Sequence, residues 1–487
     1  MSSKHVIKVL LLAAVLLALI LPATPAYSAT TASKALRFEV VKRTTTHVVL
    51  EHGSVRLAVR SDSRFVSVHG VTRYHVTKRA ATYYLLMPVI SVLDYGAHAD
   101  GTTDDVAHIQ SAIAAAHGGT VYFPAGTYKL ASTLAVPNGT TLVGESMTGA
   151  WLAGPVVYGS NSTFTDLKIG PQSAGFTGLH NVDGSNGSSF TRCHFRGGGG
   201  TTQINFPTVS IGDHADVSNL TFTDCEFERS LGTTWTGGNG NSENTISLYA
   251  QGNTVDGVTF NGCHFGVTNG VATGAQRMMV ECWTAEGASN WWRNLSFTGC
   301  VFEVSRATGL DFACMGPGSR ANPSGRGTYA TVTGCTFKGS TDVGWGYSIC
   351  SESCDHLTIT NNTFYRCTAP SINLNNFGWP ADNHATITGN TFDYDTVYEG
   401  IVTERAAILV MVNNANITGN TFTYSGLFPG WSGIVELDGS TEYTISGGDG
   451  NTVTGNTFNH NSGQTTLITQ QVGASGNTIT PNTVVYR

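Results

Sequence analysis

The chain has 487 residues, of which 58 are Gly and 14 are Pro, and 40% of them are hydrophobic while 12% are charged. This profile excludes a long all-helical protein or coiled coil, and the apolar fraction excludes a mostly disordered chain. The net charge of −7 is uneven, because residues 29–88 hold ten Lys and Arg against three Asp and Glu, whereas residues 89–487 hold fourteen against thirty. So acidic a body would repel phosphates, which excludes nucleic acid as a partner.

The first 28 residues have the pattern of a secretory signal peptide. Lys4 and Lys8 give the first residues a positive charge, and an apolar run extends from Val9 to Leu21. The small residues near Ala26 predict cleavage before Ala29. The thirteen residues of this run span only about 20 Å as a helix, which is short of the ~30 Å hydrocarbon core of a membrane. We therefore expect a secreted, extracellular protein with no membrane span in its mature form.

Residues 29–88 form a basic segment with alternating polar and apolar side chains. Arg37 to Val41 and Ser54 to Val59 show this alternation, which is typical of strands with one buried face. The sequence therefore predicts a small β extension ahead of the body at residues 89–487. This extension could bind a surface, or it could be an additional cap on the body, and the sequence leaves both roles open.

Residues 104–117 predict the one clear helix of the chain. Asp104 or Asp105 can cap its start, Ile109 and Ile113 lie on its apolar face, and Gly118 ends it. We expect this helix to cover the open end of the core that follows, because an uncovered end would expose unpaired strand edges.

A six-residue pattern recurs from residue 190 to the end of the chain. Its copies are Phe190–Phe195, Phe222–Phe227, Phe260–Phe265, Phe297–Phe302, Val332–Phe337, Ile359–Phe364, Ile387–Phe392, Ile417–Phe422 and Val453–Phe458. The fourth position is Cys in the first five copies and Asn in the others, and successive copies are 27 to 38 residues apart. Each interval contains short strands separated by turn residues, which fits one turn of a three-sided coil. The sequence thus predicts an all-β fold, a single-stranded parallel β-helix, with an Asn ladder at one turn.

The start of this body resembles a known family. The resemblance is carried by Asp94-Tyr-Gly-Ala97, Asp100-Gly-Thr-Thr-Asp-Asp105, Gly119-Thr-Val-Tyr-Phe-Pro-Ala-Gly-Thr-Tyr128 and the segment from Gly139 to Gly144. These residues are similar to the N-terminal signature of the pectate-lyase superfamily, which implies right-handed coiling and, for most members, action on polysaccharides. The resemblance does not choose between hydrolases, lyases, epimerases and adhesins. The Gly-His-Gly motif of polygalacturonases and the Asp-Pro-His-Glu motif of mannuronan epimerases are missing, so no catalytic residue is carried over.

The ten cysteines are interpreted mainly as buried thiols. Stacked Cβ atoms about 4.8 Å apart are too distant for a disulfide, so the Cys column of the repeat is predicted to be a thiol ladder. Its members are Cys193, Cys225, Cys263, Cys300 and Cys335. Cys354 and Cys367 are the candidate disulfide. The sequence predicts no cofactor, but calcium is left open because the acidic segment from Asp393 to Glu404 has oxygen ligands to offer.

A second strand precedes each Cys or Asn position and carries the candidate site. Alternation directs Ile246, Val280 and Leu310 inward. The outward residues are Tyr249, Glu281, Asp311, Asn373 and Asn375. Tryptophans flank these strands, namely Trp235, Trp283, Trp291, Trp292, Trp345 and Trp379. A groove with an acidic and amide floor and aromatic walls suits a sugar chain, because ring faces stack on aromatic side chains and hydroxyls bond to carboxylates and amides.

Each of these residues also has a plainer interpretation. Loop tryptophans can pack over a sheet without a ligand, and outward carboxylates are often solvated. Arg277 and Arg306 lie near the predicted groove in a body poor in basic residues. They could hold an acidic sugar or act as the base of an elimination, and surface ion pairs are the alternative.

Glu281 and Asp311 are the predicted catalytic pair. Aligned by their inward residues, their strands place Asp311 two residues back from Glu281, with Cβ atoms about 8 Å apart on the diagonal. That separation fits inverting hydrolysis, with Glu281 as the acid and Asp311 as the base. We therefore predict a polysaccharide-active enzyme, either a glycoside hydrolase or a lyase acting on uronic acids. The alternative is a non-catalytic glycan-binding surface or matrix protein, and a homo-oligomer is left open.

Overall fold

The computed structural model divides the chain into two compact units, Met1–Asp94 and Tyr95–Arg487. It describes residues 36–43, 47–52, 55–60, 65–68, 72–79, 82–172, 179–181, 185–196, 209–212, 215–228, 244–250, 253–267, 278–284, 292–304, 308–313, 328–339, 347–352, 354–365, 367, 370–375, 384–394, 406–424, 434–438, 448–460 and 467–486. The predicted signal peptide at residues 1–28 lies outside these ranges. No helix among the described residues is long and apolar enough to cross a membrane.

The first unit is an antiparallel sheet. Its strands are β1 (Leu36–Arg43), β2 (His47–His52), β3 (Val55–Arg60), β4 (Phe65–Val68), β5 (Thr72–Arg79) and β6 (Thr82–Ser91). They pair in the order β3–β2–β1–β6–β5–β4. The strand β6 continues through Pro88, so the boundary expected between residues 88 and 89 falls inside a strand rather than in a linker.

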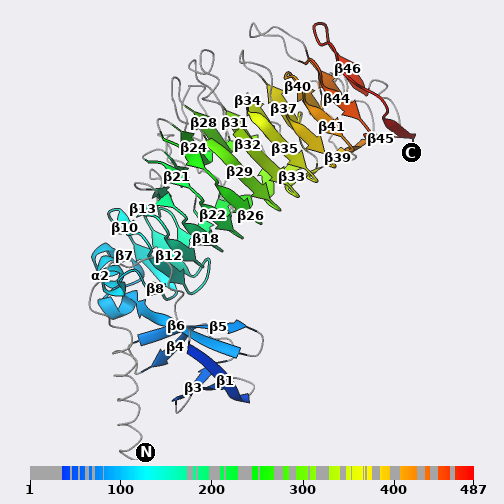
Figure 1. Cartoon of the computed structure of the whole chain (residues 1–487). Helices are drawn as coiled ribbons and strands as arrows, with labels where there is room; N and C mark the ends of the chain where they lie inside the picture. Colours follow the sequence, from blue (N-terminus) through cyan, green and yellow to red (C-terminus); the bar gives the residue numbers. More distant parts are fainter. Residues whose placement is uncertain are drawn as a thin grey trace, which may run out of the picture. The chain divides into compact units, whose positions relative to one another are not determined.

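The second unit is a stack of coils in which the chain returns repeatedly to three parallel sheets (Figure 1). Sheet I contains β10 (Leu134–Val136), β13 (Val156–Tyr158), β16 (Leu179–Asn181), β20 (Val209–Ile211), β24 (Asn244–Ala250), β28 (Met278–Thr284), β31 (Thr308–Ala313), β34 (Ile349–Glu352), β37 (Ile372–Asn375), β40 (Ile408–Val410), β43 (Val435–Leu437) and β46 (Ile468–Gln470). The strands of each sheet follow one another in chain order, as expected for a parallel β-helix.

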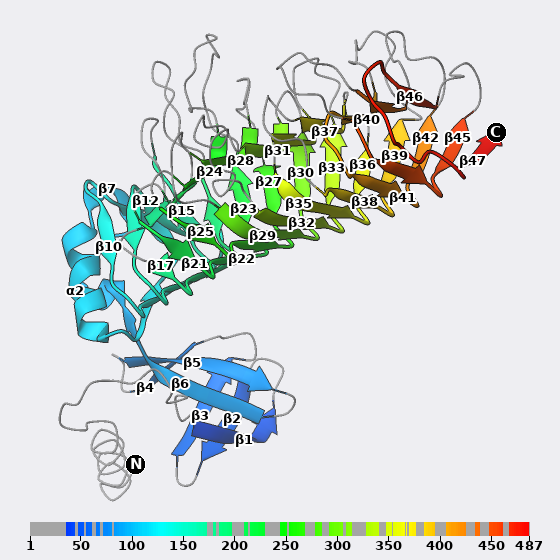
Figure 2. The same cartoon turned by 45° about the horizontal axis from the view of Figure 1, so that its top comes forward.

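Sheets II and III complete each coil (Figure 2). Sheet II contains β8 (Thr120–Phe123), β11 (Thr141–Gly144), β14 (Thr163–Thr165), β17 (Ser185–Asn186), β18 (Ser189–Thr191), β21 (Val217–Ser218), β22 (Thr221–Thr223), β25 (Val255–Asp256), β26 (Thr259–Asn261), β29 (Trp292–Thr298), β32 (Thr328–Thr333), β35 (Asp355–Thr360), β38 (Thr386–Thr388), β41 (Asn416–Thr418) and β44 (Thr452–Thr454). Sheet III contains β7 (Asp100–Asp104), β9 (Gly126–Lys129), β12 (Ala150–Ala153), β15 (Lys168–Ile169), β19 (His194–Phe195), β23 (Glu226–Glu228), β27 (His264–Val267), β30 (Val301–Val304), β33 (Thr336–Gly339), β36 (Thr363–Tyr365), β39 (Thr391–Tyr394), β42 (Thr421–Tyr424), β45 (Thr457–His460) and β47 (Thr483–Tyr486).

Stacked phenylalanines form the core between the sheets. Phe190 and Phe222 lie with ring centroids 4.9 Å apart and nearly parallel, and the same stacking continues along sheet II to Phe297. A second stack runs along sheet III from Phe195 to Phe458, with centroids 4.6 to 5.1 Å apart. Each stacked pair contributes about 0.5–1.5 kcal/mol beyond the burial of its area.

The predicted Asn ladder joins coils at the turn between sheets II and III. The amide of Asn390 donates to Ile359 O and to Asn420 Oδ1, both at 2.9 Å, while its own Oδ1 accepts from the backbone of Asn362 at 2.9 Å. Cysteine continues this ladder toward the N-terminus. Cys335 Sγ lies 3.5 Å from Phe297 O, the carbonyl that corresponds to Ile359 O two coils away. The thiols therefore act as donors as well as apolar filling.

The thiol ladder is confirmed, but the expected disulfide is wrong. All five ladder cysteines are free and buried, and so are Cys354 and Cys367. The pKa of Cys193 and of Cys263 is raised well above the usual value by burial and by hydrogen bonding to the neighbouring thiol Cys225. Burial likewise raises the pKa of Cys367 to about 11. These groups are neutral thiols at physiological pH.

A short 3-10 helix, η1 (Val92–Tyr95), spans the boundary between the two units, and the helix α2 (Val106–Ala116) lies near the start of the second unit. The helix packs against β8 and β10 at the first coils, with Ile109 and Ile113 buried, as the sequence predicts. Asp105 stands at the N-cap but makes no capping bond. Its buried carboxylate instead accepts from the backbone of His98 at 2.6 Å and of Ala99 at 3.1 Å.

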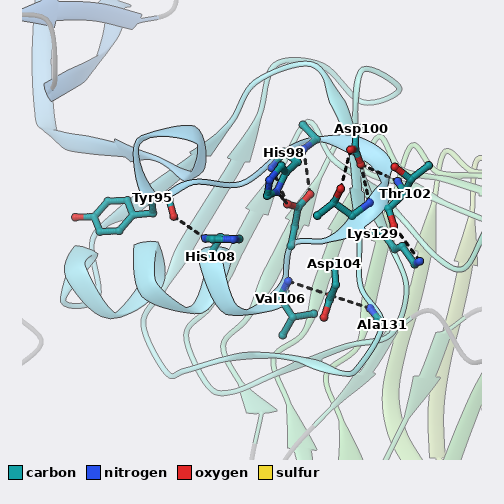
Figure 3. A network of polar contacts seen from close by, with 12 residues as sticks. Tyr95, His98, Asp100, Thr102, Asp104, Val106, His108, Lys129 and Ala131 are labelled. Carbon is teal, nitrogen blue, oxygen red and sulfur yellow. Dashed lines mark hydrogen bonds and ion pairs between the residues drawn. The ribbon is translucent and has the colours of Figure 1, made fainter.

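The Asp100-Gly-Thr-Thr-Asp-Asp105 motif therefore holds the start of the helix onto the first coil (Figure 3). Asp100 Oδ1 accepts from the backbone of Thr102 and of Thr103, both at 2.8 Å, and these bonds lower the pKa of the carboxyl well below its usual range. Asp104 Oδ1 joins the helix to the coil by accepting from Ala131 N at 3.1 Å. Every carboxylate of the motif is bound to nearby backbone, so the motif has a structural role.

The state of the cysteines can be measured directly. Thiol titration in denaturant without reductant should find at least nine reactive groups per chain, because nine described cysteines are free. The native protein should react slowly at neutral pH, because these thiols are buried and the reagent cannot reach them. Fewer than five thiols in denaturant would contradict the thiol ladder, because the ladder alone has five.

The ladder also predicts an unequal effect of two substitutions at Asn390. Asn390→Asp removes the donors to Ile359 O and Asn420 Oδ1 and should lower the free energy of unfolding by at least ~2 kcal/mol. Asn390→Cys keeps a donor to Ile359 O, as Cys335 does for Phe297 O, and should cost less. Urea denaturation of both variants measures the difference, and equal losses would show that the side-chain donor is unimportant.

Candidate functional site

The outer face of sheet I brings the predicted site residues into two columns. The inward residues Ile246, Val280 and Ile349 are fully buried, which leaves the alternate positions facing outward. By strand register the first outward column is Ser247, Glu281, Asp311, Cys350, Asn373, Leu409 and Glu436. The second is Tyr249, Trp283, Ala313, Glu352 and Asn375. The polar residues that the sequence analysis selected therefore lie on one face.

Several polar side chains of this face are buried. Glu281 is 5% exposed, and the amides Asn373 and Asn375 are 4% and 7% exposed. Asn373 Nδ2 lies 4.0 Å from Cys350 Sγ, its neighbour in the first column. Burying polar side chains is costly unless partners compensate, so their concentration on one face marks it as a candidate binding site.

The register between β28 and β31 corrects the expected geometry of Glu281 and Asp311. The two residues pair directly, because Val280 pairs with Leu310 and Cys282 pairs with Phe312. The predicted offset of two residues is wrong, because the two strands pair with Glu281 directly opposite Asp311. Paired positions on adjacent strands lie about 4.8 Å apart rather than about 8 Å. The side chain of Asp311 lies outside the described residues, and its place opposite Glu281 is given by the strand register.

The aromatic walls are only partly described. Tyr249 and Trp283 pair in register on β24 and β28, although their side chains lie outside the described residues. The predicted positions outside the described residues altogether are Trp235, Trp291, Trp345, Trp379, Arg277 and Arg306. The prediction for Trp292 is wrong, because its side chain is 0% exposed. Trp292 begins β29 and pairs with Val255, which is also buried, so it is a core residue rather than a sugar contact.

Two carboxylates that the sequence analysis missed lie further along the same face. Glu436 and Asp438 are 0% and 1% exposed, and Glu436 Oε1 accepts from Gln471 Nε2 at 2.9 Å. The segment from Val435 to Asp438 alternates apolar and acidic residues, and that alternation was the signal that could have identified them. Five strand steps separate β28 from β43, about 24 Å, so these carboxylates and Glu281 cannot act on the same bond.

A second polar cluster lies on the outer face of sheet III. His194 contacts Glu226 Oε2 through Nδ1 at 2.9 Å and Glu228 Oε1 through Nε2 at 2.6 Å. Lys168 Nζ lies 3.5 Å from the same Glu228 oxygen and 5.0 Å from the ring centre of Trp151. The charged groups of this cluster neutralise one another, so it is better suited to joining coils than to binding a substrate.

Electrostatics supports this structural role. Burial by itself raises the pKa of Glu228, but the hydrogen bond and charge of His194, with the charges of Lys168 and Arg196, bring the net pKa below the usual value. The carboxylate is thus stabilised in its charged form by the fold. A neutral imidazole has one N–H, so both contacts of His194 are donor bonds only when a proton is added to the ring.

The cluster predicts a pH-dependent contribution to stability. Glu228→Gln should lower the free energy of unfolding by about 1–3 kcal/mol at pH 7. Because the folded pKa of Glu228 is lowered, its stabilising effect is complete above the unfolded pKa near 4.3 and is lost as the pH falls through the folded value. Urea denaturation of both proteins at pH 7 and near pH 3 should show the gap shrinking in acid, whereas a constant gap would contradict this account.

The described residues contain no group of three or more His, Cys, Asp or Glu side chains arranged to hold a metal ion. The predicted calcium segment is described only at Asp393 and Tyr394, and the rest of it lies outside the described residues.

Comparison with known families identifies two matching models. The model for rhamnogalacturonase A/epimerase, pectate lyase-like, matches residues 89–311. The model for a right-handed β-helix region matches residues 244–449 and 320–486. Together they extend from the end of β6 to the last strand.

Curated proteins share short segments with this chain. A glucan 1,3-beta-glucosidase of Cochliobolus carbonum is 38% identical over 79 residues, 16% of this chain and 9% of that protein. The mannuronan C5-epimerase AlgE3 of Azotobacter vinelandii is 43% identical over 67 residues, 12% of this chain and 4% of that protein. The chain thus spans less than a tenth of the length of these relatives.

Solved structures share the fold over most of the chain. The A-module of the Azotobacter vinelandii mannuronan C-5 epimerase AlgE6 superposes with a TM-score of 0.52 and 16% identity, covering 82% of this chain and 99% of that one. The surface adhesin PfbA of Streptococcus pneumoniae also gives 0.52 and 16%, covering 82% and 92%. At this identity the likeness establishes architecture, and it includes both an enzyme and an adhesin.

Proposed function

Because this chain belongs to the pectate-lyase-like superfamily of right-handed parallel β-helices, we propose that it is a secreted carbohydrate-active enzyme that cleaves a polysaccharide. The proposed site is the outer face of sheet I around β28 and β31. Secretion is part of the proposal on the strength of the N-terminal sequence, where Lys4 and Lys8 and the apolar run from Val9 to Leu21 have the pattern of a signal peptide.

The observation that carries the proposal is the direct pairing of Glu281 and Asp311 on adjacent strands. Both positions face outward, and Glu281 is almost completely buried. Most glycosidases use a pair of Asp or Glu side chains at the bond that is cleaved. The curated relatives add support, because their names describe a glucosidase and a mannuronan epimerase.

The strand register favours a two-step mechanism. Adjacent positions about 4.8 Å apart fit the ~5 Å separation of carboxyl groups in retaining enzymes better than the ~6.5–9.5 Å of inverting enzymes. Glu281, which is 5% exposed, is assigned as the acid that protonates the leaving oxygen. Asp311 attacks the anomeric carbon and forms a glycosyl ester. Glu281, now deprotonated, then takes a proton from water, which hydrolyses the ester and frees Asp311.

The neighbouring outward residues would hold the sugar chain. Tyr249 and Trp283 pair in the second column beside Ser247 and Glu281, where aromatic rings could face sugar rings. Asn373 and Asn375 continue the face two strands beyond Asp311 and offer amides to hydroxyl groups. A polysaccharide lying across the strands would meet these residues in succession.

A polysaccharide screen tests the proposal. Incubation with acidic and neutral polysaccharides should release reducing ends, and absorbance at 232–235 nm would appear as well if the reaction is an elimination from a uronic acid. Glu281→Gln and Asp311→Asn should each lower turnover on the active polysaccharide by at least ~100-fold, because each removes one acid–base or nucleophilic group. Their melting temperatures should stay close to that of the parent protein.

Glu436→Gln is the matched control. It makes the same change at a buried carboxylate of the same face, about 24 Å from Glu281, and should retain turnover. If Glu281→Gln and Asp311→Asn both keep full activity, this part of the face is not the active site. Polysaccharide binding without either signal would instead favour the non-catalytic glycan-binding protein.

A further inference from the structure

Each coil of the second unit has a residue with left-handed backbone just before or within its sheet II segment. These residues have φ between +44° and +80° and occupy one column along the stack. From the N-terminal side they are Gly118, Gly139, Asn161, Gly187, Asn219, Gly257, Asn294, Tyr329, His356, His384, Asn414, Gly450 and Gly476. The flanking register confirms the alignment, since Thr328 pairs with Asp355 and Ala330 with Leu357 on either side of Tyr329 and His356.

Tyr329 is the outlier of this column. Glycine, asparagine and histidine adopt left-handed backbone comparatively easily, but a bulky side chain such as tyrosine does so at a cost of about 1–2 kcal/mol. The turn itself does not require tyrosine, because Asn294 has φ +54° one coil earlier and Tyr329 has φ +58°. Strain of this kind persists where the side chain serves a purpose.

The side chains of the three aromatic positions form an outer stack. The ring centroids of Tyr329 and His356 are 4.8 Å apart, and those of His356 and His384 are 5.1 Å apart, with interplanar angles of 27° and 25°. Tyr329 ends this stack, because the next residue of the column is Asn294, and the side chain is 55% exposed. The stack therefore holds an aromatic ring rigidly at the surface, outside the core.

We propose that the Tyr329–His356–His384 stack is a saccharide-binding site separate from the face of sheet I. The C–H groups of a pyranose ring carry partial positive charge and suit the negative face of an aromatic ring. Imidazole N–H groups beside it can donate to sugar hydroxyls. A ring already fixed by stacking loses little conformational entropy when it binds, so the ladder pre-organises the contact.

The position of the stack suggests how it would serve the enzyme. Tyr329 lies on β32, the strand that follows β31 and Asp311 in the same coil. A polysaccharide anchored on Tyr329 would be kept close to the coil that carries Asp311, one member of the proposed catalytic pair. The identity of the ligand as a polysaccharide rests on the proposed function, whereas the strained, exposed stack is an independent observation.

The test compares binding with stability in Tyr329→Asn. Electrophoresis through native gels containing mannuronan, polygalacturonate, β-1,3-glucan or α-1,3-glucan should show retardation of the parent protein by at least one of them. Tyr329→Asn should weaken that binding about three- to tenfold, the loss of one aromatic stacking contact. Its melting temperature should be unchanged or higher, because Asn adopts the left-handed backbone more easily.

Two further variants complete the experiment. Tyr329→Phe should keep the binding because it keeps the ring, and Tyr365→Asn, which removes an exposed tyrosine from sheet III, should leave binding unchanged. Retardation by none of the polysaccharides, unaltered binding in Tyr329→Asn, or a lowered melting temperature in that variant would each overturn the inference. Loss of turnover in Glu281→Gln with no effect of Tyr329→Asn would leave the proposed function standing alone. Tyr329-dependent binding without any cleavage would support the binding site at Tyr329 and contradict the proposed enzymatic function.

Discussion

The hydrogen bond from each ladder side chain to a carbonyl of an adjacent coil is the interaction on which the rest of the structure depends. Asn390 and its equivalents satisfy buried backbone groups that no strand pairing reaches, and Cys335 and the other thiols do so in the earlier coils. An offset of one residue between coils would break every rung and misalign both phenylalanine stacks. The ladder therefore sets the register of sheets II and III.

This register also determines what the outer surfaces carry. On sheet III it places His194 beside Glu226 and aligns Glu228 with its basic neighbours, so charged residues from distant parts of the sequence neutralise one another. At the start of the sheet II segments it stacks Tyr329, His356 and His384 in consecutive coils. Sheet I has no ladder of identical residues, and its outward columns hold carboxylates and amides that differ from coil to coil. Because repeated residues in sheets II and III hold the coils in register, the outward residues of sheet I can vary and form a site.

The sequence predicts well those parts of the fold in which the same residue recurs. Phe, Cys and Asn repeat at fixed offsets because each must stack on its equivalent, so the sheets and ladder follow from the pattern. Sheet I has no such marker. The predicted offset between the strands misplaces Asp311, because Val280 pairs with Leu310. Trp292 was expected in a loop since the short repeat does not reveal that β29 begins at that residue. The left-handed column is also not predictable from the sequence. Asn and Gly commonly adopt this backbone angle, but a tyrosine at position 329 does not indicate it.

The most direct test of the central claim is a crystal structure of the Glu281→Gln variant with an oligosaccharide of the active polysaccharide bound. The account predicts a sugar chain across β24, β28 and β31 on the outer face of sheet I, with its reacting bond beside residues 281 and 311. A second sugar at Tyr329 would be compatible with this result. An oligosaccharide bound only elsewhere, for example over Trp151 on sheet III, would contradict the assignment of the site.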